Sequence, residues 1–227
     1  MVTSTVITDP QDWADESILL PHELIRSALN RMEHVLKEDN FGEYAIWKIT
    51  YFQRWYKKYF CTFVEHHHTA EENIYFPFIK TKVEIPEKVE TDHSELMNLM
   101  DDIKGIYDID LLRNKVSILK EKMFEHLAEE EQIIPSALRD NFTKLQEKII
   151  VNMIIQSLGL SGNKVALPWV LDNMSTWTTQ SNIDEIYNGL PRFIKFMYNN
   201  FWLKDYKKNN IGLLDAILSN KQKKCFC

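Results

Sequence analysis

Glycine and proline are scarce in this chain, with six and seven residues among 227. They fall almost entirely where helical patterns break. A sandwich or barrel would need many turns, so this scarcity argues against an all-β protein and favours an all-α one. Hydrophobic and charged residues make up 44% and 26% of the chain, as in ordinary globular proteins. The length suits one well-buried domain with a smaller appendage.

Long apolar runs are also missing. No stretch of eighteen apolar residues is present, which argues against a transmembrane helix. Residues 1–13 lack the layout of a signal peptide. Three cysteines, Cys61, Cys225 and Cys227, offer no disulfide framework. We therefore expect a reducing, cytoplasmic location.

Basic residues are unevenly distributed. The net charge is −6, yet residues 191–227 contain eight lysines and arginines against two aspartates and so carry +6. The rest of the chain carries −12. Such an acidic body makes nucleic acid an unexpected partner, whereas the basic end favours an anionic membrane surface.

Four long helical patterns come first, over residues 18–37, 42–77, 86–105 and 110–135, with Pro21 expected in the first turn of the first helix. Short connections predict antiparallel neighbours, so residues 1–140 are expected to form an up-down-up-down four-helix bundle. Residues 141–219 are expected to form a helical appendage packed on the bundle as a lid or brace, with a loop at 159–162. Residues 220–227 form a Lys/Cys tail.

Two of the four helices carry the same polar pair, a histidine followed four residues later by a glutamate. On a helix this spacing places both side chains on one face, about one turn apart. Each pair also follows a helix with one histidine in its apolar stripe. The six residues are His22, His67, Glu71, His93, His126 and Glu130.

All six lie within apolar stripes that should face the core. Buried polar groups are costly without partners, and a shared metal would satisfy them together. Separate buried hydrogen-bonded pairs are the alternative, because a single histidine on an apolar face usually needs no metal. Nitrogen and carboxylate ligands without thiolate suit iron or manganese, and suit zinc less well. Ferritin-type bundles use the different order Glu-x-x-His.

In residue types, order and helix placement these six residues resemble the hemerythrin-like (HHE) family over about residues 18–138. The run from His66 to Phe76 and Pro77 is similar to the histidine-rich segment that ends in Phe-Pro in that family. The resemblance implies two irons, capped by the histidines and bridged by Glu71 and Glu130. It also implies oxygen or another small diatomic as the partner.

One position departs from the oxygen carriers of the family. They have a fifth histidine one turn after the third-helix histidine, where this chain has Met97. The pattern is therefore closer to four-histidine relatives implicated in iron or oxygen sensing and nitrosative-stress repair. His68 could supply a fifth ligand, although adjacent helical residues point about 100° apart.

The remaining polar residues near the motifs have two interpretations. Each of four glutamates could orient a ligand imidazole or lie on a solvated face; these are Glu65, Glu72, Glu129 and Glu131. His34 is expected in solvent, and His66 is expected to face a neighbouring helix or water.

The tail ends in Cys225-Phe226-Cys227 after lysines. This ending resembles the doubly prenylated terminus of Rab-type GTPases, and two lipids with a basic patch would attach the chain to a membrane. An unmodified tail is the alternative.

Three functions share the predicted ligands. The first is a protein that binds or senses oxygen, a related diatomic or iron. The second is a di-iron oxidase, peroxidase or nitric-oxide-handling enzyme, and the third is an iron-dependent interaction module. The lack of a second catalytic motif favours binding over turnover. The sequence identifies no protein partner.

Overall fold

Helices account for almost all of the backbone that the structure describes. A computed structural model describes residues 12–37, 40–41 and 46–222, and these contain no strand. The expectation of an all-α protein is confirmed. The local cause is visible in α1 (Trp13–Val35), whose buried residues include Ile18, His22, Ile25 and Leu29. Residues three and four apart share one helical face, so this stripe turns inward.

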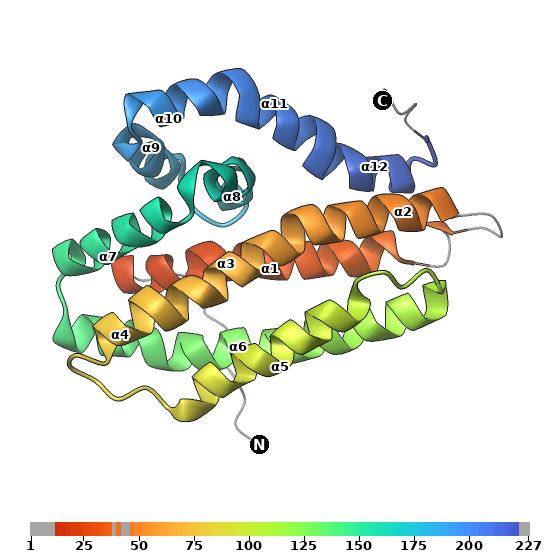
Figure 1. Cartoon of the computed structure of the whole chain (residues 1–227). Coiled ribbons are helices and arrows are strands. Elements are labelled where there is room, and N and C mark those ends of the chain that lie inside the picture. The colour runs from red at the N-terminus through yellow and green to blue at the C-terminus, as the bar shows by residue number, and fades with distance from the viewer. Residues whose placement is uncertain (1–11, 38–39, 42–45, 223–227) are drawn as a thin grey trace.

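Four long helical segments lie side by side (Figure 1). The first is α1, the third is α5 (Glu87–Ile103) and the fourth is α6 (Ile109–Asn141). The second is continuous from residue 46 to residue 79 and consists of α2 (Ile46–Trp55), η2 (Tyr56–Cys61), α3 (Thr62–Ala70), η3 (Glu71–Tyr75) and α4 (Phe76–Ile79). The short connection between α5 and α6 turns at Gly105, where φ is 88°. The Gln53 side chain accepts a hydrogen bond from the Gly105 N–H at 3.0 Å and stabilises this turn.

Two predicted helix ends were wrong. The first helix begins at Trp13, after the N-cap Asp12, so Pro21 lies well inside the helix and not in its first turn. The fourth helix does not end at Pro135 but continues to Asn141. A proline inside a helix removes one hydrogen bond. Next to Pro135 the side chains of Ile134 and Leu138 are fully buried, and this packing keeps the chain helical.

The second segment contains two π-helical turns, η2 and η3, on either side of α3. A π turn is wider than an α turn, shifts the residues that follow it around the helix, and is frequent at functional sites. The turn η3 begins at Glu71, one of the predicted metal ligands.

The appendage lies along one side of the four segments (Figure 1). Its helices are α7 (Lys144–Ser157), α8 (Gly159–Met174), α9 (Gln180–Gly189), α10 (Arg192–Met197), η4 (Tyr198–Trp202), α11 (Leu203–Asp205), η5 (Tyr206–Ile211) and α12 (Gly212–Leu218). The loop predicted at 159–162 is instead a tight turn between α7 and α8. Gly159 has φ of 57°, a left-handed conformation that glycine adopts without strain, and α8 starts there.

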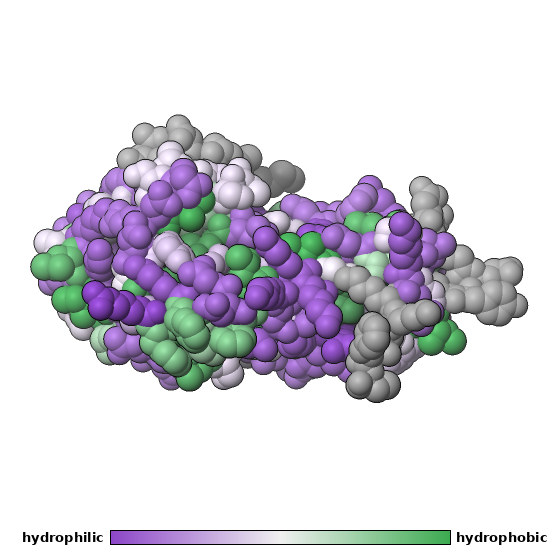
Figure 2. All heavy atoms as spheres, turned by 90° about the horizontal axis from the view of Figure 1, so that it is seen from above, coloured by the Kyte–Doolittle hydropathy of each residue, from purple (hydrophilic) through white to green (hydrophobic). Residues whose placement is uncertain are grey.

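The appendage shares a buried core with the bundle. Trp55 of α2 packs edge-on against Trp169 of α8, with ring centroids 5.7 Å apart, and its indole N–H donates to Asn210 Oδ1 at 2.9 Å. Seen from above, which is the side where the appendage lies, the surface is mostly hydrophilic with scattered hydrophobic patches (Figure 2). The appendage is therefore joined to the bundle by packed side chains as well as by the chain itself.

Cys61 is a free and buried cysteine, and burial raises the pKa of its thiol to about 12. Cys225 and Cys227 lie outside the described residues, so membrane attachment through them stays a prediction. Within the described part of the chain, no helix combines the length and the apolar character that crossing a membrane requires.

Candidate metal centre

The six predicted ligands come from all four long segments and meet in the bundle interior. Five of them are buried, and the side chain of the sixth, His67, is 7% exposed. The imidazoles of His22 and His67 contact each other edge-on, with centroids 5.4 Å apart. Those of His93 and His126 do the same at 4.8 Å. The inward stripes therefore bring together the residues that sequence spacing had placed on four separate helices.

The potential ligand atoms form two groups. One contains His22, His67, Glu71 and Glu130, and the other contains His68, His93 and His126. Within each group, one ligand atom from each residue lies within 4.8 Å of every other. Each group has the size and the donor types of a site for one metal ion.

The two glutamates connect these groups. Glu71 Oε1 lies 3.4 Å from His67 Nε2 in the first group, and Glu71 Oε2 lies 3.6 Å from His93 Nε2 in the second. Glu130 Oε2 lies 3.1 Å from His22 Nε2, and Glu130 Oε1 lies 3.5 Å from His126 Nε2. Each carboxylate thus directs one oxygen to either group, as a bridging ligand would.

His68 joins the site although the sequence favoured its neighbour alone. Its side chain is buried, and its ring stacks on that of His93, with centroids 4.1 Å apart and 8° between the planes. Two adjacent residues can both face inward because α3 lies between two helices of the bundle. His67 faces His22 of α1, whereas His68 faces α5. Met97, at the position where the oxygen carriers have their fifth histidine, is half-buried, and its side chain has no nitrogen or oxygen that could bind a metal.

Many polar atoms of the centre lack a hydrogen-bond partner within the part of the chain that the structure describes. Ten buried atoms make no hydrogen bond of acceptable geometry, although His22 Nε2 and Glu130 Oε2 lie 3.1 Å apart: His22 Nε2, His67 Nε2, both ring nitrogens of His68, His93 Nε2, both ring nitrogens of His126, Glu71 Oε2 and both carboxylate oxygens of Glu130. Buried polar groups are almost always paired, and an unpaired one costs about 1–3 kcal/mol. Converging nitrogen and oxygen atoms without partners fit a bound metal cation.

The electrostatics keep several imidazoles neutral. Burial, followed by the neighbouring His22, lowers the pKa of His67 well below its usual range. Burial, followed by the neighbouring His67, likewise lowers the pKa of His68 well below its usual range. The pKa of His126 is also lowered, chiefly by burial. A neutral imidazole has a free lone pair, which is the form that binds metal.

The two glutamates differ in charge. Burial, together with the carboxylate of Glu130, raises the pKa of Glu71 well above its usual value. Burial also opposes ionisation of Glu130, but the imidazoles of His126 and His22 outweigh it and hold the pKa of Glu130 well below normal. Two carboxylates this close repel each other. Metal cations between them would allow both to ionise.

Outer residues hold some of the imidazoles in place. His22 Nδ1 lies 2.9 Å from Glu131 Oε1, which also accepts from Arg26 Nη1 at 2.7 Å. Burial opposes the charge on Glu131, but His22 and Arg26 prevail and lower its pKa. His93 Nδ1 lies 3.1 Å from Glu72 Oε1. These contacts direct Nε2 of each histidine toward the centre.

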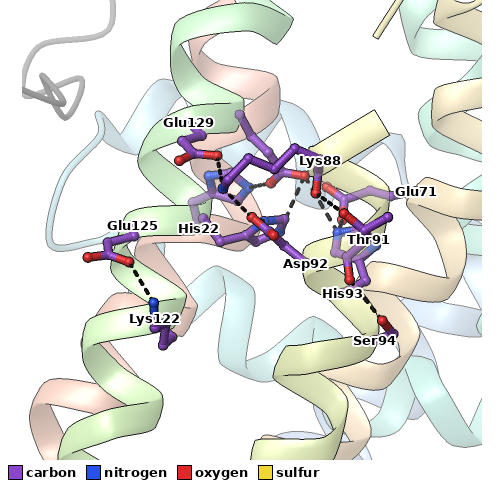
Figure 3. Close-up of polar contacts among 12 residues, drawn as sticks. His22, Glu71, Lys88, Thr91, Asp92, His93, Ser94, Lys122, Glu125 and Glu129 are labelled. Atoms are coloured by element: carbon purple, nitrogen blue, oxygen red, sulfur yellow. Dashed lines mark hydrogen bonds and ion pairs between the residues drawn. The ribbon is translucent and has the colours of Figure 1, made fainter. Parts of the chain in front are cut away.

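The other two candidate glutamates have no such role. Glu129 pairs with Lys88 at 2.6 Å, and the same lysine pairs with Asp92 (Figure 3). Glu65 pairs with Lys104 at 3.1 Å. Surface residues with lysine partners are the simpler interpretation of both glutamates.

The two histidines outside the centre lie as expected. His34 is exposed. His66 is half-buried and faces α8, where a Cβ added to Gly162 would come within 3.3 Å of His66 Nε2.

Comparison with known proteins gives one match. A family model described as the hemerythrin HHE cation binding domain matches residues 15–138, more than half of the chain. Neither a curated protein nor a solved structure matches the chain. The matched range contains all the residues of the centre, His68 included, and ends before the appendage begins.

Proposed function

The chain belongs to the hemerythrin HHE cation-binding domain family, and we propose that it holds two iron ions and uses them to bind or sense oxygen or a related diatomic. His22 and His67 would hold one ion, and His68, His93 and His126 the other. Glu71 and Glu130 would serve both. The scaffold would be the up-down-up-down four-helix bundle expected from the short connections between helices.

One observation carries the proposal of two ions. The two oxygens of Glu71 point to different histidine groups, and so do those of Glu130. A site for a single ion would leave the second histidine group unexplained. Nitrogen and carboxylate ligands without thiolate favour iron or manganese over zinc.

A pair of irons held here would supply a redox-active centre able to take up a diatomic. The protein's own part is to fix the ligands and exclude water. Glu131 and Glu72 hold the Nδ1 sides of His22 and His93. The ring of Phe76, which is fully buried, stacks over His93 with centroids 5.8 Å apart. Such outer contacts set ligand orientation and solvent access.

A di-iron oxidase or peroxidase is the second candidate. It is favoured by one observation, an apolar cavity whose lining includes His67 and Glu71. Binding remains the first candidate because the sequence contains no second catalytic motif.

Metal analysis of aerobically purified protein tests the proposal. We expect about two irons per chain and near-ultraviolet absorption from ferric iron, whereas zinc is spectrally silent. Glu130→Gln should empty both positions because its carboxylate would serve both ions. Glu129→Gln is the matched control, since the neighbouring Glu129 pairs with Lys88 at the surface and should leave the iron content unchanged. One zinc and no iron in the wild-type protein would contradict the proposal.

A further inference from the structure

A cavity of about 230 Å³ lies between the bundle and the appendage. The bundle side of its lining comes from α1, α3 and η3, and the appendage side comes from α7, α8 and α9. The appendage side lies outside the residues matched by the family model. The cavity therefore exists only because the appendage packs where it does.

One part of the cavity meets the metal centre. His67 and Glu71 belong to its lining, whereas His68, His93 and His126 do not. The cavity thus approaches the centre from the side of the first histidine group. A molecule inside it would lie against side chains proposed as ligands of one ion.

The lining is chemically uniform. Most of its residues are apolar, such as Ile18, Phe63, Val170 and Leu190, and none is a lysine or an arginine. An anionic group would lose its hydration here without gaining a lysine or arginine partner, which is costly.

Away from His67 and Glu71, the polar residues Asn163 and Ser17 of the lining are already engaged. The amide nitrogen of Asn163 donates to two backbone carbonyls of the appendage, those of Ile155 at 2.9 Å and Gly159 at 2.7 Å. The hydroxyl of Ser17 donates to Glu147. Recognition in this cavity would therefore depend on shape and apolar contact.

The volume is large for a diatomic. A water molecule needs only about 10–15 Å³, and an apolar cavity of about 150 Å³ accommodates benzene. The 230 Å³ found here exceeds both. We propose that the cavity is a binding site for a neutral apolar organic molecule, larger than benzene, that lies beside His67 and Glu71. Its location beside a metal rests on the proposed function, whereas binding itself requires only the cavity.

Naphthalene is a suitable probe, because it is neutral, apolar and larger than benzene. 1-Naphthoate is the matched charged probe. Fluorescence titration of the full-length protein as purified should show one naphthalene site per chain and at least tenfold weaker binding of naphthoate. Naphthalene should also shift the absorption of the iron-loaded protein.

Two variants would narrow the cavity from different helices. Ala166→Phe places a ring into the lining from α8, and Ile154→Phe enlarges a side chain of α7. Each should weaken naphthalene binding at least tenfold at unchanged iron content and helicity. Leu160→Phe is the control, because Leu160 also lies on α8 but is 55% exposed and outside the lining.

Absence of naphthalene binding to the wild-type protein would overturn the proposal, as would undiminished binding by whichever narrowing variant folds. Equal binding of naphthoate and naphthalene would also contradict it. Iron content measured on the same samples separates the two proposals. Missing iron with intact naphthalene binding would count against the metal centre alone, whereas intact iron without naphthalene binding would count against the cavity alone.

Discussion

Removing the metal should destabilise the whole fold. The perturbation is reduction followed by chelation, which would leave ten buried polar atoms of the centre without partners. Metal affinity is part of the folding free energy when ligands are assembled only by folding. We therefore expect the chelated protein to melt well below the loaded one.

The magnitude follows from the unpaired atoms. Each costs about 1–3 kcal/mol if nothing replaces the metal. Imidazoles and carboxylates can rearrange and pair with one another, so we count only half of the ten atoms at the lower value, about 5 kcal/mol. This is comparable to the total stability of a typical domain, about 5–15 kcal/mol. For a chain of this size 1 kcal/mol corresponds to about 2–4 °C in Tm, so the expected drop is roughly 10–20 °C.

Circular dichroism melting of one protein batch would measure this difference, with samples taken as purified, after chelation, and after iron is restored. Restored iron should return the original Tm. The Glu129→Gln variant should show the same drop as the wild-type protein, because Glu129 lies outside the centre. An unchanged melting curve after verified metal loss would refute the reasoning and show that the buried polar groups satisfy one another.

Three further predictions concern single residues. His68→Gln should weaken metal binding by more than the roughly 10–100-fold that is typical of residues outside the ligand set. Competition with a chelator would measure this loss. If Met97→Gln weakened metal binding equally, His68 would not be a ligand. Glu131→Gln should weaken metal binding about 10–100-fold, because it removes the carboxylate that holds His22 Nδ1 and that also pairs with the Arg26 charge. An unchanged metal affinity would contradict this positioning role. Burial raises the pKa of Glu147 above its usual 4.5. The folded state therefore loses stability as pH rises from 4.5, the pKa in the unfolded chain, to the higher pKa in the folded protein. Glu147→Gln should accordingly melt above wild type at pH 7, with a difference that shrinks as pH falls toward 5, and a pH-independent difference would count against it.

Much of the fold was predictable because helical spacing is local information. The stripes around His22, His67, His93 and His126 follow from residues three and four apart, and such residues share a face in any helix. The all-α class and the family were therefore correct from sequence. Helix ends were less predictable. Continuation through Pro135 depends on packing by Ile134 and Leu138, which no local pattern reveals.

The assignment of His68 shows where local reasoning stopped. The 100° between neighbouring residues excludes one of them only if a helix has a single buried face. In this bundle α3 is covered on two sides, so His67 and His68 are both directed inward. A wider view of which helices flank α3 was needed, and the sequence motif alone did not contain it.

By itself, the sequence determined the helical class, the family and the six polar residues that converge at the centre, because each depends on spacing within one helix. Only the tertiary structure decided that His68 joins the centre, that each glutamate directs its two oxygens to different groups, and that an apolar cavity meets His67 and Glu71. These features depend on the distances between residues far apart in the chain. Such distances are set by how whole helices pack, and that packing is a property of all the side chains in the core together.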